Sequence, residues 1–146
     1  MKFFRLLLLF VLLLLSGCSA TVIMQPAEDA NNPACAEVMV RLPNQTDNQN
    51  KRVTSSQSTA AWGEPVSVSL TCGLKPVEVS ELACISAGGV DWLVDEKDQP
   101  IYRFISFGRT PATLVTVDST KVSGASVLED LGQAVQFTEK TKNCLG

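Results

Sequence analysis

Ten apolar residues follow one another from Leu6 to Leu15. Such a run does not fold as part of a domain in water, so it sets the start of this chain apart from the rest. As a helix the run would span about 15 Å, roughly half the hydrocarbon core of a bilayer, and it is therefore too short for a transmembrane anchor. It follows a short basic start that contains Lys2 and Arg5, which is the pattern of a secretory signal peptide. We therefore expect residues 1–17 to be a signal peptide that is removed on export.

The apolar run ends in Leu15-Ser16-Gly17-Cys18, which resembles the bacterial lipobox. In that motif an aliphatic residue and two small residues precede a cysteine that receives a diacylglyceryl group and becomes the first residue of the mature chain. Two or three acyl chains, at about 0.8 kcal/mol per buried CH₂, would hold the protein stably on the outer face of the cytoplasmic membrane. The alternative is an ordinary secretory signal in which Cys18 is incidental. Both interpretations predict an extracytoplasmic protein.

The remaining cysteines predict two disulfides, because an even number of thiols in an exported domain usually pairs. These cysteines are Cys35, Cys72, Cys84 and Cys144. Of the three possible pairings we favour Cys72–Cys84, which would tie neighbouring strands, and Cys35–Cys144, which would lock both ends of the domain. Each bond would add about 3–5 kcal/mol by restricting the unfolded chain. A metal site or redox pair is the alternative, but the chain has no CxxC spacing and no histidine.

Charge and composition exclude several function classes. Beyond residue 17 the chain has 129 residues with 10 basic and 15 acidic side chains, a net charge of −5, since Lys2 and Arg5 carry the charges of the first 17. This acidic balance argues against a nucleic-acid partner, because phosphates require clustered lysine and arginine. The absence of histidine excludes Ser-His-Asp and Cys-His catalysis and histidine-ligated zinc. We therefore expect no cofactor and no metal.

The first half of the exported chain predicts one helix between two irregular stretches. Residues 18–32 are expected to be the lipidated cysteine and a flexible tether. Residues 33–42 are expected to form a short helix with Asn32 as its N-cap and Pro33 as its first residue. Its apolar side chains recur at helical spacing on one face. Residues 44–60 are rich in Asn, Gln, Ser and Thr, and we expect a mobile loop there.

The second half predicts four strands followed by a helix. Alternating or β-branched and aromatic residues predict strands over residues 66–72, 90–94, 101–107 and 113–117, with a charged turn at 95–100. Ser126 and Glu129 resemble a capping box that opens the second helix. Its inward residues would be Val127, Leu128, Leu131, Ala134 and Val135. Residues 33–146 are thus expected to be a single α+β domain, an antiparallel four-stranded sheet with the N-terminal and C-terminal helices on one face.

Several short motifs occur in a fixed order along the domain. They are Trp62-Gly63-Glu64-Pro65, Cys72-Gly73, Val90-Asp91-Trp92-Leu93 and Phe107-Gly108-Arg109-Thr110-Pro111, with a terminal Cys144. Together with the lipobox and a cysteine before a helix, this set resembles an actinobacterial family of exported proteins and lipoproteins, domain-of-unknown-function family 3515, over about residues 33–146. The resemblance implies a Gram-positive, high-GC envelope and agrees with two disulfides. It implies no activity, substrate or catalytic residue.

Three residues are the candidates for an interaction site. Trp62 lies between a polar loop and a Gly-Pro turn that could present its ring to a partner. Arg109 lies in a turn between two strands, where we expect it to pair with Asp91 or Glu64 and fix that turn. Anion binding by Arg109 is the functional alternative.

Acidic residues offer two weaker possibilities. Glu78, Glu81 and Asp91 could supply paired carboxylates for glycoside hydrolysis, which needs no histidine. The acidic residues within 95–98 could bind calcium loosely, although the stretch lacks the glycine and the ligand spacing of a high-affinity loop. Solvated carboxylates are the simpler interpretation in both places.

The sequence as a whole predicts a lipid-anchored protein of the cell envelope that binds an envelope protein or a cell-wall component and is not an enzyme. The alternatives are a small-ligand carrier associated with transport and a carboxylate-based hydrolase. A binding module predicts an exposed patch around residues 44–65. A carrier predicts a deep apolar pocket, and a hydrolase predicts two carboxylates that face each other across a cleft.

Overall fold

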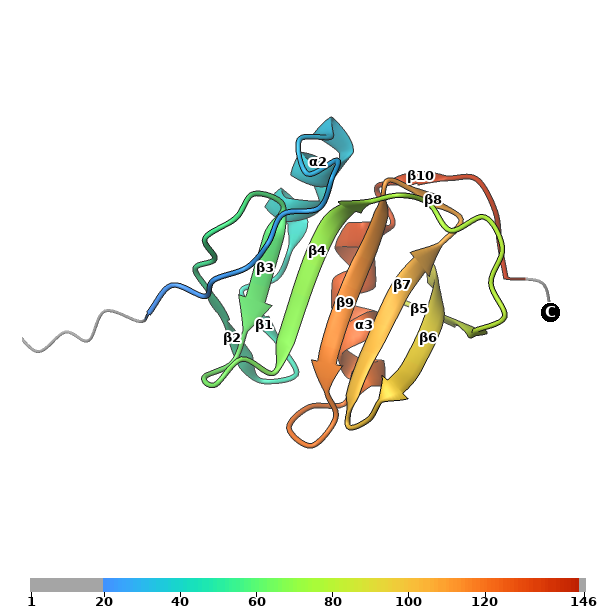
Figure 1. Ribbon diagram of the computed structural model, residues 1–146. Helices are drawn as coiled ribbons and strands as arrows, with labels where there is room; N and C mark the ends of the chain where they lie inside the picture. The colour runs from blue at the N-terminus through green and yellow to red at the C-terminus, as the bar shows by residue number, and fades with distance from the viewer. Residues whose placement is uncertain (1–19, 145–146) are drawn as a thin grey trace, which may run out of the picture.

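The computed structural model describes residues 20–144 as a mostly β structure with two short helices (Figure 1). The predicted signal peptide and Cys18 lie outside the described residues. The helices are α2 (Pro33–Arg41) and α3 (Gly124–Val135). The strands are β1 (Gln45–Thr46), β2 (Gln49–Arg52), β3 (Thr59–Trp62), β4 (Val68–Leu74), β5 (Ala83–Ala87), β6 (Val90–Asp98), β7 (Ile101–Phe107), β8 (Arg109–Thr110), β9 (Ala112–Asp118) and β10 (Glu139–Lys140). None of the helices within residues 20–144 is long and apolar enough to cross a membrane.

Eight of these strands form one antiparallel sheet in the order β1-β2-β3-β4-β9-β7-β6-β5, and β8 pairs with β10 separately. The predicted α+β domain with a four-stranded sheet is therefore wrong. Four of the sheet strands correspond to predicted ones, and the sheet is wider because β1, β2 and β3 arise from the polar stretch expected to be a loop. A fourth addition, β5, forms a hairpin with β6 around Gly88 and Gly89.

The core lies between the sheet and α3, which crosses one face of it (Figure 1). On β4 the alternation predicted from sequence is confirmed, since Val68, Leu70 and Cys72 are buried and the residues between them are partly exposed. The inward residues predicted for α3 are all buried as well. The inner face is mostly apolar, with Ser106 and Thr113 as buried polar exceptions, and α3 covers the middle of it. Within residues 20–144 no helix covers the opposite face of the sheet.

Both helices are present, but α3 begins earlier than predicted. The α2 prediction is confirmed, with Asn32 Oδ1 accepting a hydrogen bond from the Ala34 N–H at 2.9 Å. The N-cap of α3 is Ser123, and the capping box expected at Ser126 is wrong. Glu129 instead reaches across to the sheet, where its Oε2 accepts a hydrogen bond from the Gly88 N–H at 2.8 Å.

The four domain cysteines form two disulfides, but the pairing favoured from sequence is wrong. The bonds are Cys35–Cys72, which joins α2 to β4, and Cys84–Cys144, which joins β5 to the C-terminal segment. Strand order explains the difference: β9, β7 and β6 lie between β4 and β5, so Cys72 and Cys84 are not on neighbouring strands.

The segment before α2, residues 20–32, lies along the domain, and we call it the N-terminal strap. Val22 forms a parallel bridge with Thr54, and the Asp29 N–H donates to the Gly73 carbonyl at 3.0 Å. Ala30 is buried, and its carbonyl accepts from Ser58 Oγ. The flexible tether was expected to extend through residue 32, and the strap contradicts that expectation for residues 20–32.

The charged turn predicted at 95–100 is mostly strand. β6 continues to Asp98, and the turn is confined to residues 99–100. Asp98 pairs with Arg103 on β7 and is not free for a cation. Among residues 20–144 no group of acidic, cysteine or histidine side chains could hold a metal ion.

Candidate binding surface

Trp62, predicted to present its ring to a partner, is fully buried. It lies on β3 opposite Val68 of β4, and its indole Nε1 donates to the Pro43 carbonyl at 3.1 Å. The exposed patch expected around residues 44–65 is therefore not built on this ring. The prediction failed because the preceding stretch was interpreted as a loop, whereas it pairs into the sheet.

Arg109 has the structural role expected of it, but its predicted partners are wrong. Its guanidinium is buried and donates to the carbonyls of Gln136 and Thr138 at 2.8 Å and of Gly89 at 3.0 Å. Within the described residues it forms no ion pair with Asp91 or Glu64. Burial lowers the pKa of Arg109, and the charge of Asp91 raises it. The three carbonyls engage three of the five N–H donors of the guanidinium, and Nε is buried without a hydrogen-bond partner among the described residues.

Asp91 holds two segments of backbone together. Its carboxylate accepts from Ser86 Oγ on β5 at 2.5 Å and from the Cys144 N–H at 2.9 Å. Burial raises the pKa of Asp91, but these two hydrogen bonds and the charges of Lys140 and Arg109 outweigh it and keep the pKa below its ordinary value of 3.8. Asp91 and Arg109 thus fasten the β5–β6 hairpin; Arg109 is buried and Asp91 is partly exposed.

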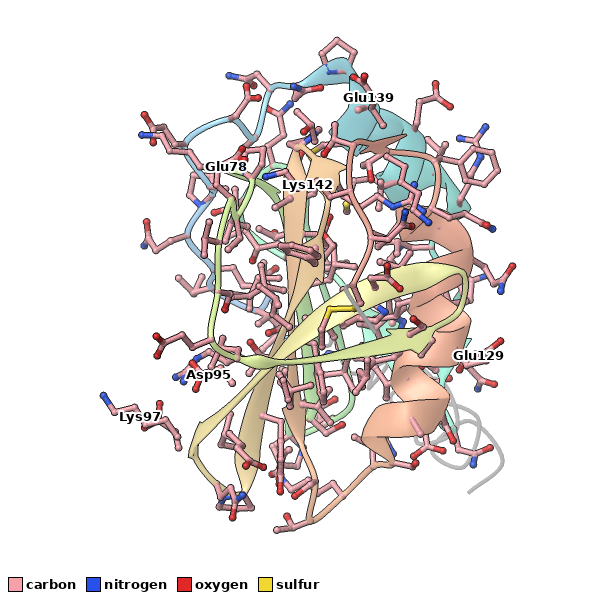
Figure 2. All side chains as sticks on the ribbon, turned by 90° about the vertical axis from the view of Figure 1, so that its right-hand side faces the viewer. Glu78, Asp95, Lys97, Glu129, Glu139 and Lys142 are labelled. Atoms are coloured by element: carbon pink, nitrogen blue, oxygen red, sulfur yellow. A yellow bond between two sulfur atoms is a disulfide. The ribbon has the colours of Figure 1, made fainter. Side chains whose placement is uncertain are left out.

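Within residues 20–144, the hairpin that they fasten ends the sheet in an edge strand, β5, with no further strand beside it; Figure 2 faces this side. β5 pairs with β6 on one side, and the sequence Ala-Cys-Ile-Ser-Ala contains no charged residue and no proline. Charges, prolines and very short strands are the usual protections of a sheet edge against pairing with another chain. The opposite edge is protected in this way, because β1 has two residues. β5 has five and lacks all three protections.

The hairpin geometry indicates which backbone groups face outward. Gly88 and Gly89 both have positive φ, at 58° and 75°, which is the requirement of a two-residue type I′ turn. Ala87 and Val90 therefore form the hydrogen-bonded pair that closes the turn, and pairing alternates from there. It follows that Cys84 and Ser86 direct their N–H and C=O groups to the free edge.

A groove lies on the outer face of the sheet beside this edge. It has a volume of about 250 Å³ and is lined by Ser80, Leu82, Cys84, Leu93, Phe107 and Cys144. Lys142 and Glu78, labelled in Figure 2, pair with each other and tie the C-terminal segment to the loop that leads into β5. Apolar side chains are exposed around the edge: Val79 by 88%, and Leu82 and Ile85 by 41% each. We call β5 together with this groove the edge surface.

A family model described as a protein of unknown function, DUF3515, matches residues 7–144. The chain belongs to the DUF3515 family. The resemblance to family 3515 drawn from the ordered motifs is thereby confirmed, whereas the actinobacterial source and the lipoprotein character remain predictions. The match covers β5, the groove and both disulfides. Comparison with curated proteins and with solved structures found no match.

Other hollows lined by described residues of the DUF3515 chain differ in character. One, about 190 Å³, is lined by Tyr102, Phe104, Val117, Ser119 and Gly124 and lies at the turn end of β7 and β9. The other, about 400 Å³, lies between the strap and the loop after β4, with charged Glu28, Asp29 and Lys75 in its wall. The first is smaller than the usual 300–1,000 Å³ of a small-molecule site, and in the wall of the second Lys75 and Glu28 pair with each other at 3.0 Å.

The carboxylates proposed for hydrolysis are placed differently from what that chemistry requires. In the DUF3515 chain Glu78 is exposed and paired with Lys142, whereas Asp91 is engaged by Ser86 and the C-terminal segment. The sequence reasoning missed the edge surface because β5 is short and built of small residues. The signal that could have revealed it is the Gly-Gly pair directly before the strand predicted at 90–94, which is typical of a hairpin turn.

Proposed function

We propose that this DUF3515 chain is a lipid-anchored, extracytoplasmic protein of the cell envelope that works as a binding module for another envelope protein. The anchoring part is supported by the apolar run and by the lipobox-like Leu15-Ser16-Gly17-Cys18. Two disulfides support an oxidising compartment, since such bonds are rare in the reducing cytosol. The signal sequence and the disulfides therefore point to the same side of the membrane.

The single observation that carries the binding function is the unprotected edge β5. A sheet edge offers backbone N–H and C=O groups at a fixed spacing, and the ligand that matches them is another extended backbone. We propose that a partner segment adds as a strand along Cys84 and Ser86. An apolar side chain of the partner would enter the groove beside Leu82 and Phe107.

This chemistry favours a protein over a cell-wall glycan as the partner. The hydroxyls of a glycan call for polar side chains, whereas the edge surface offers backbone groups and the apolar Leu82 and Ile85, with Val79 exposed beside it. The absence of charge within β5 also fits a partner selected by shape and hydrogen bonding.

Photo-crosslinking in intact cells tests the proposal. A photoreactive phenylalanine derivative is placed at Ile85, and in the control at Val40 on α2, which is exposed by 77% and lies on another element. The expected result is a discrete protein adduct from position 85 and none from position 40. Once the partner is purified, hydrogen exchange should show new protection of the Cys84 and Ser86 amides on binding.

Matched variants complete the test. Ile85→Lys places a charge on the edge and should abolish complex formation, because charged edge residues oppose strand addition. Val40→Lys introduces the same charge elsewhere and should leave the affinity unchanged. If the two variants bind alike, or if protection appears away from β5, strand addition at this edge is ruled out.

A further inference from the structure

The N-terminal strap is held to the domain from its first described residue. The Ala20 carbonyl accepts from Arg52 Nη2 at 2.8 Å. Arg52 is itself fixed, because its Nη1 donates to the Gly63 carbonyl at 2.9 Å and its side chain is only 10% exposed. Two residues later Val22 pairs with Thr54. The Val22 N–H donates to the Val53 carbonyl at 2.8 Å, and the Ser55 N–H donates to the Val22 carbonyl at 2.9 Å.

Very little chain separates the proposed lipid from this fixed point. Cys18 and Ala20 have one residue between them, so their Cα atoms lie at most about 7 Å apart even if the chain is fully extended. An acyl group on Cys18 must lie in the bilayer, which places Ala20 next to the headgroups. The chain between the proposed lipid and the domain is therefore too short to hold the domain away from the membrane.

The part of the surface that is brought to the bilayer is apolar. Ile23 is 77% exposed and Val53 is 70% exposed. Ile23 follows Val22, and Val53 precedes Thr54, in the parallel Val22–Thr54 bridge. Because side chains alternate along a strand, the side chains of Ile23 and Val53 point to the same side of this pair of segments. Aliphatic side chains at the level of the headgroups partition into the boundary between headgroups and acyl chains.

We infer that Ile23 and Val53 form a membrane-contact surface that lies on the lipid leaflet carrying the anchor and orients the domain on it. The inference rests on the proposed lipid anchor, and it deepens that function by fixing the direction of the binding edge. In Figure 1 the strap begins beyond β2 at one side of the sheet, and β5 lies at the other side. The edge surface would thus point away from the membrane, toward partners in the envelope.

Crosslinking to lipid tests the inference on the full chain purified from membranes. The mass of the N-terminal peptide is measured first to establish whether Cys18 carries a diacylglyceryl group. The protein is then reconstituted in vesicles of phosphatidylethanolamine and phosphatidylglycerol, with a photoreactive phenylalanine derivative at Ile23, Val53 or Val40. Val40 is the matched control, since it is exposed by the same 77% as Ile23 but lies on α2.

The expected result is a severalfold higher yield of lipid adducts from positions 23 and 53 than from position 40. Ile23→Asp should lower the adduct yield at position 53 severalfold while the protein stays in the vesicle fraction, because the acyl chains, not Ile23, hold it there. A lipidated Cys18 with equal yields at all three positions would contradict this inference alone. An unmodified Cys18 would contradict the lipid-anchored function and this inference together.

Discussion

Arg109 shows how a single buried cation can organise a corner of this fold. Its three hydrogen bonds reach Gln136 and Thr138, in the short segment between α3 and β10, and Gly89 in the turn of the β5–β6 hairpin, which is distant from that segment in the sequence. The Gln136 carbonyl is at the C-cap of α3, where carbonyls have no partner within the helix. Hydrogen bonds that involve a charged group are the stronger kind, at about 1.5–3 kcal/mol each. Arg109 is thus a structural residue that stabilises the base of the edge surface.

Arg109→Ala should lower the free energy of unfolding by at least about 3 kcal/mol and the melting temperature by about 10 °C, because three carbonyls lose a charged donor. Thermal unfolding followed by circular dichroism measures both. Arg103→Ala is the control, since Arg103 pairs with Asp98 on the surface, where solvent screens the charges and the pair contributes little to stability. An unchanged melting temperature for Arg109→Ala would show that Arg109 does not have this structural role.

Asp91 makes the stability of the domain depend on pH in a definite direction. Its pKa in the folded protein is below the ordinary 3.8, so the unfolded chain binds the proton more readily. The stabilisation from its carboxylate is therefore fully present above the unfolded pKa and is lost as pH falls through the folded pKa. We expect the stability difference between the unsubstituted chain and Asp91→Asn to be largest above about pH 5 and to shrink below pH 4.

Denaturant unfolding of both proteins at a series of pH values measures this difference. Glu81→Gln serves as the control, since Glu81 lies exposed in the loop before β5. A difference that stays constant down to pH 2.5 would mean that the Asp91 carboxylate makes no net contribution through its charge.

At the scale of elements, α3 and the β5–β6 hairpin approach each other so closely at Gly132 and Gly88 that there is no room for a side chain between them. A Cβ added to Gly132 would lie 2.6 Å from the Gly88 carbonyl oxygen and 2.7 Å from the Gly88 Cα. Glycine in the middle of a helix normally lowers stability by about 1 kcal/mol relative to alanine. The close contact with the hairpin explains why glycine is nevertheless found at this position.

Gly132→Ala should therefore destabilise the domain, by about 1–3 kcal/mol, although the same change in a free helix would stabilise it. Ser126→Ala, on an exposed turn of α3, should be near neutral or slightly stabilising. Chemical denaturation gives both values. A gain in stability for Gly132→Ala would show that the helix and the hairpin are not in direct backbone contact.

The elements that could be predicted are those whose side chains alternate strongly or repeat at helical spacing. β7 was predicted at its observed bounds, and the inward faces of β4 and α3 were predicted residue by residue. β2 and β5 were missed because their polar or small side chains carry no apolar alternation; pairing with a neighbour gives them their structure. The disulfide pairing depends on strand order, which a pattern within one segment does not contain.

The candidate site was predicted less well than the fold. Trp62 was chosen for its aromatic ring and its neighbouring turn residues, but burial depends on which strand lies beside it, here β4. Arg109 and Asp91 were rightly singled out, yet their partners are mostly backbone groups, which every residue has and no sequence motif marks. The edge surface is defined by the absence of a neighbouring strand, and that is a property of the assembled sheet.

At the scale of the whole molecule, the strap belongs to the domain. A chain that starts at Asn32 lacks the Val22–Thr54 bridge, the Asp29–Gly73 hydrogen bond and the buried Ala30. We expect it to be less stable than a chain that starts at Ala20 by about 2 kcal/mol, after the entropy of ordering the strap is subtracted. Equal melting temperatures for the two chains would show that the strap contributes no net stability.

The Cys35–Cys72 disulfide also decides how the molecule would respond to a mechanical load. A pull on the N-terminus first reaches the hydrogen bonds of the strap, which can open one after another. At Cys35 the load passes through a covalent bond to Cys72 on β4, a strand flanked on both sides by β3 and β9. Force would thus enter the interior of the sheet, where strands are held by ladders on two sides, and the peripheral hairpin with the binding edge would stay out of its path.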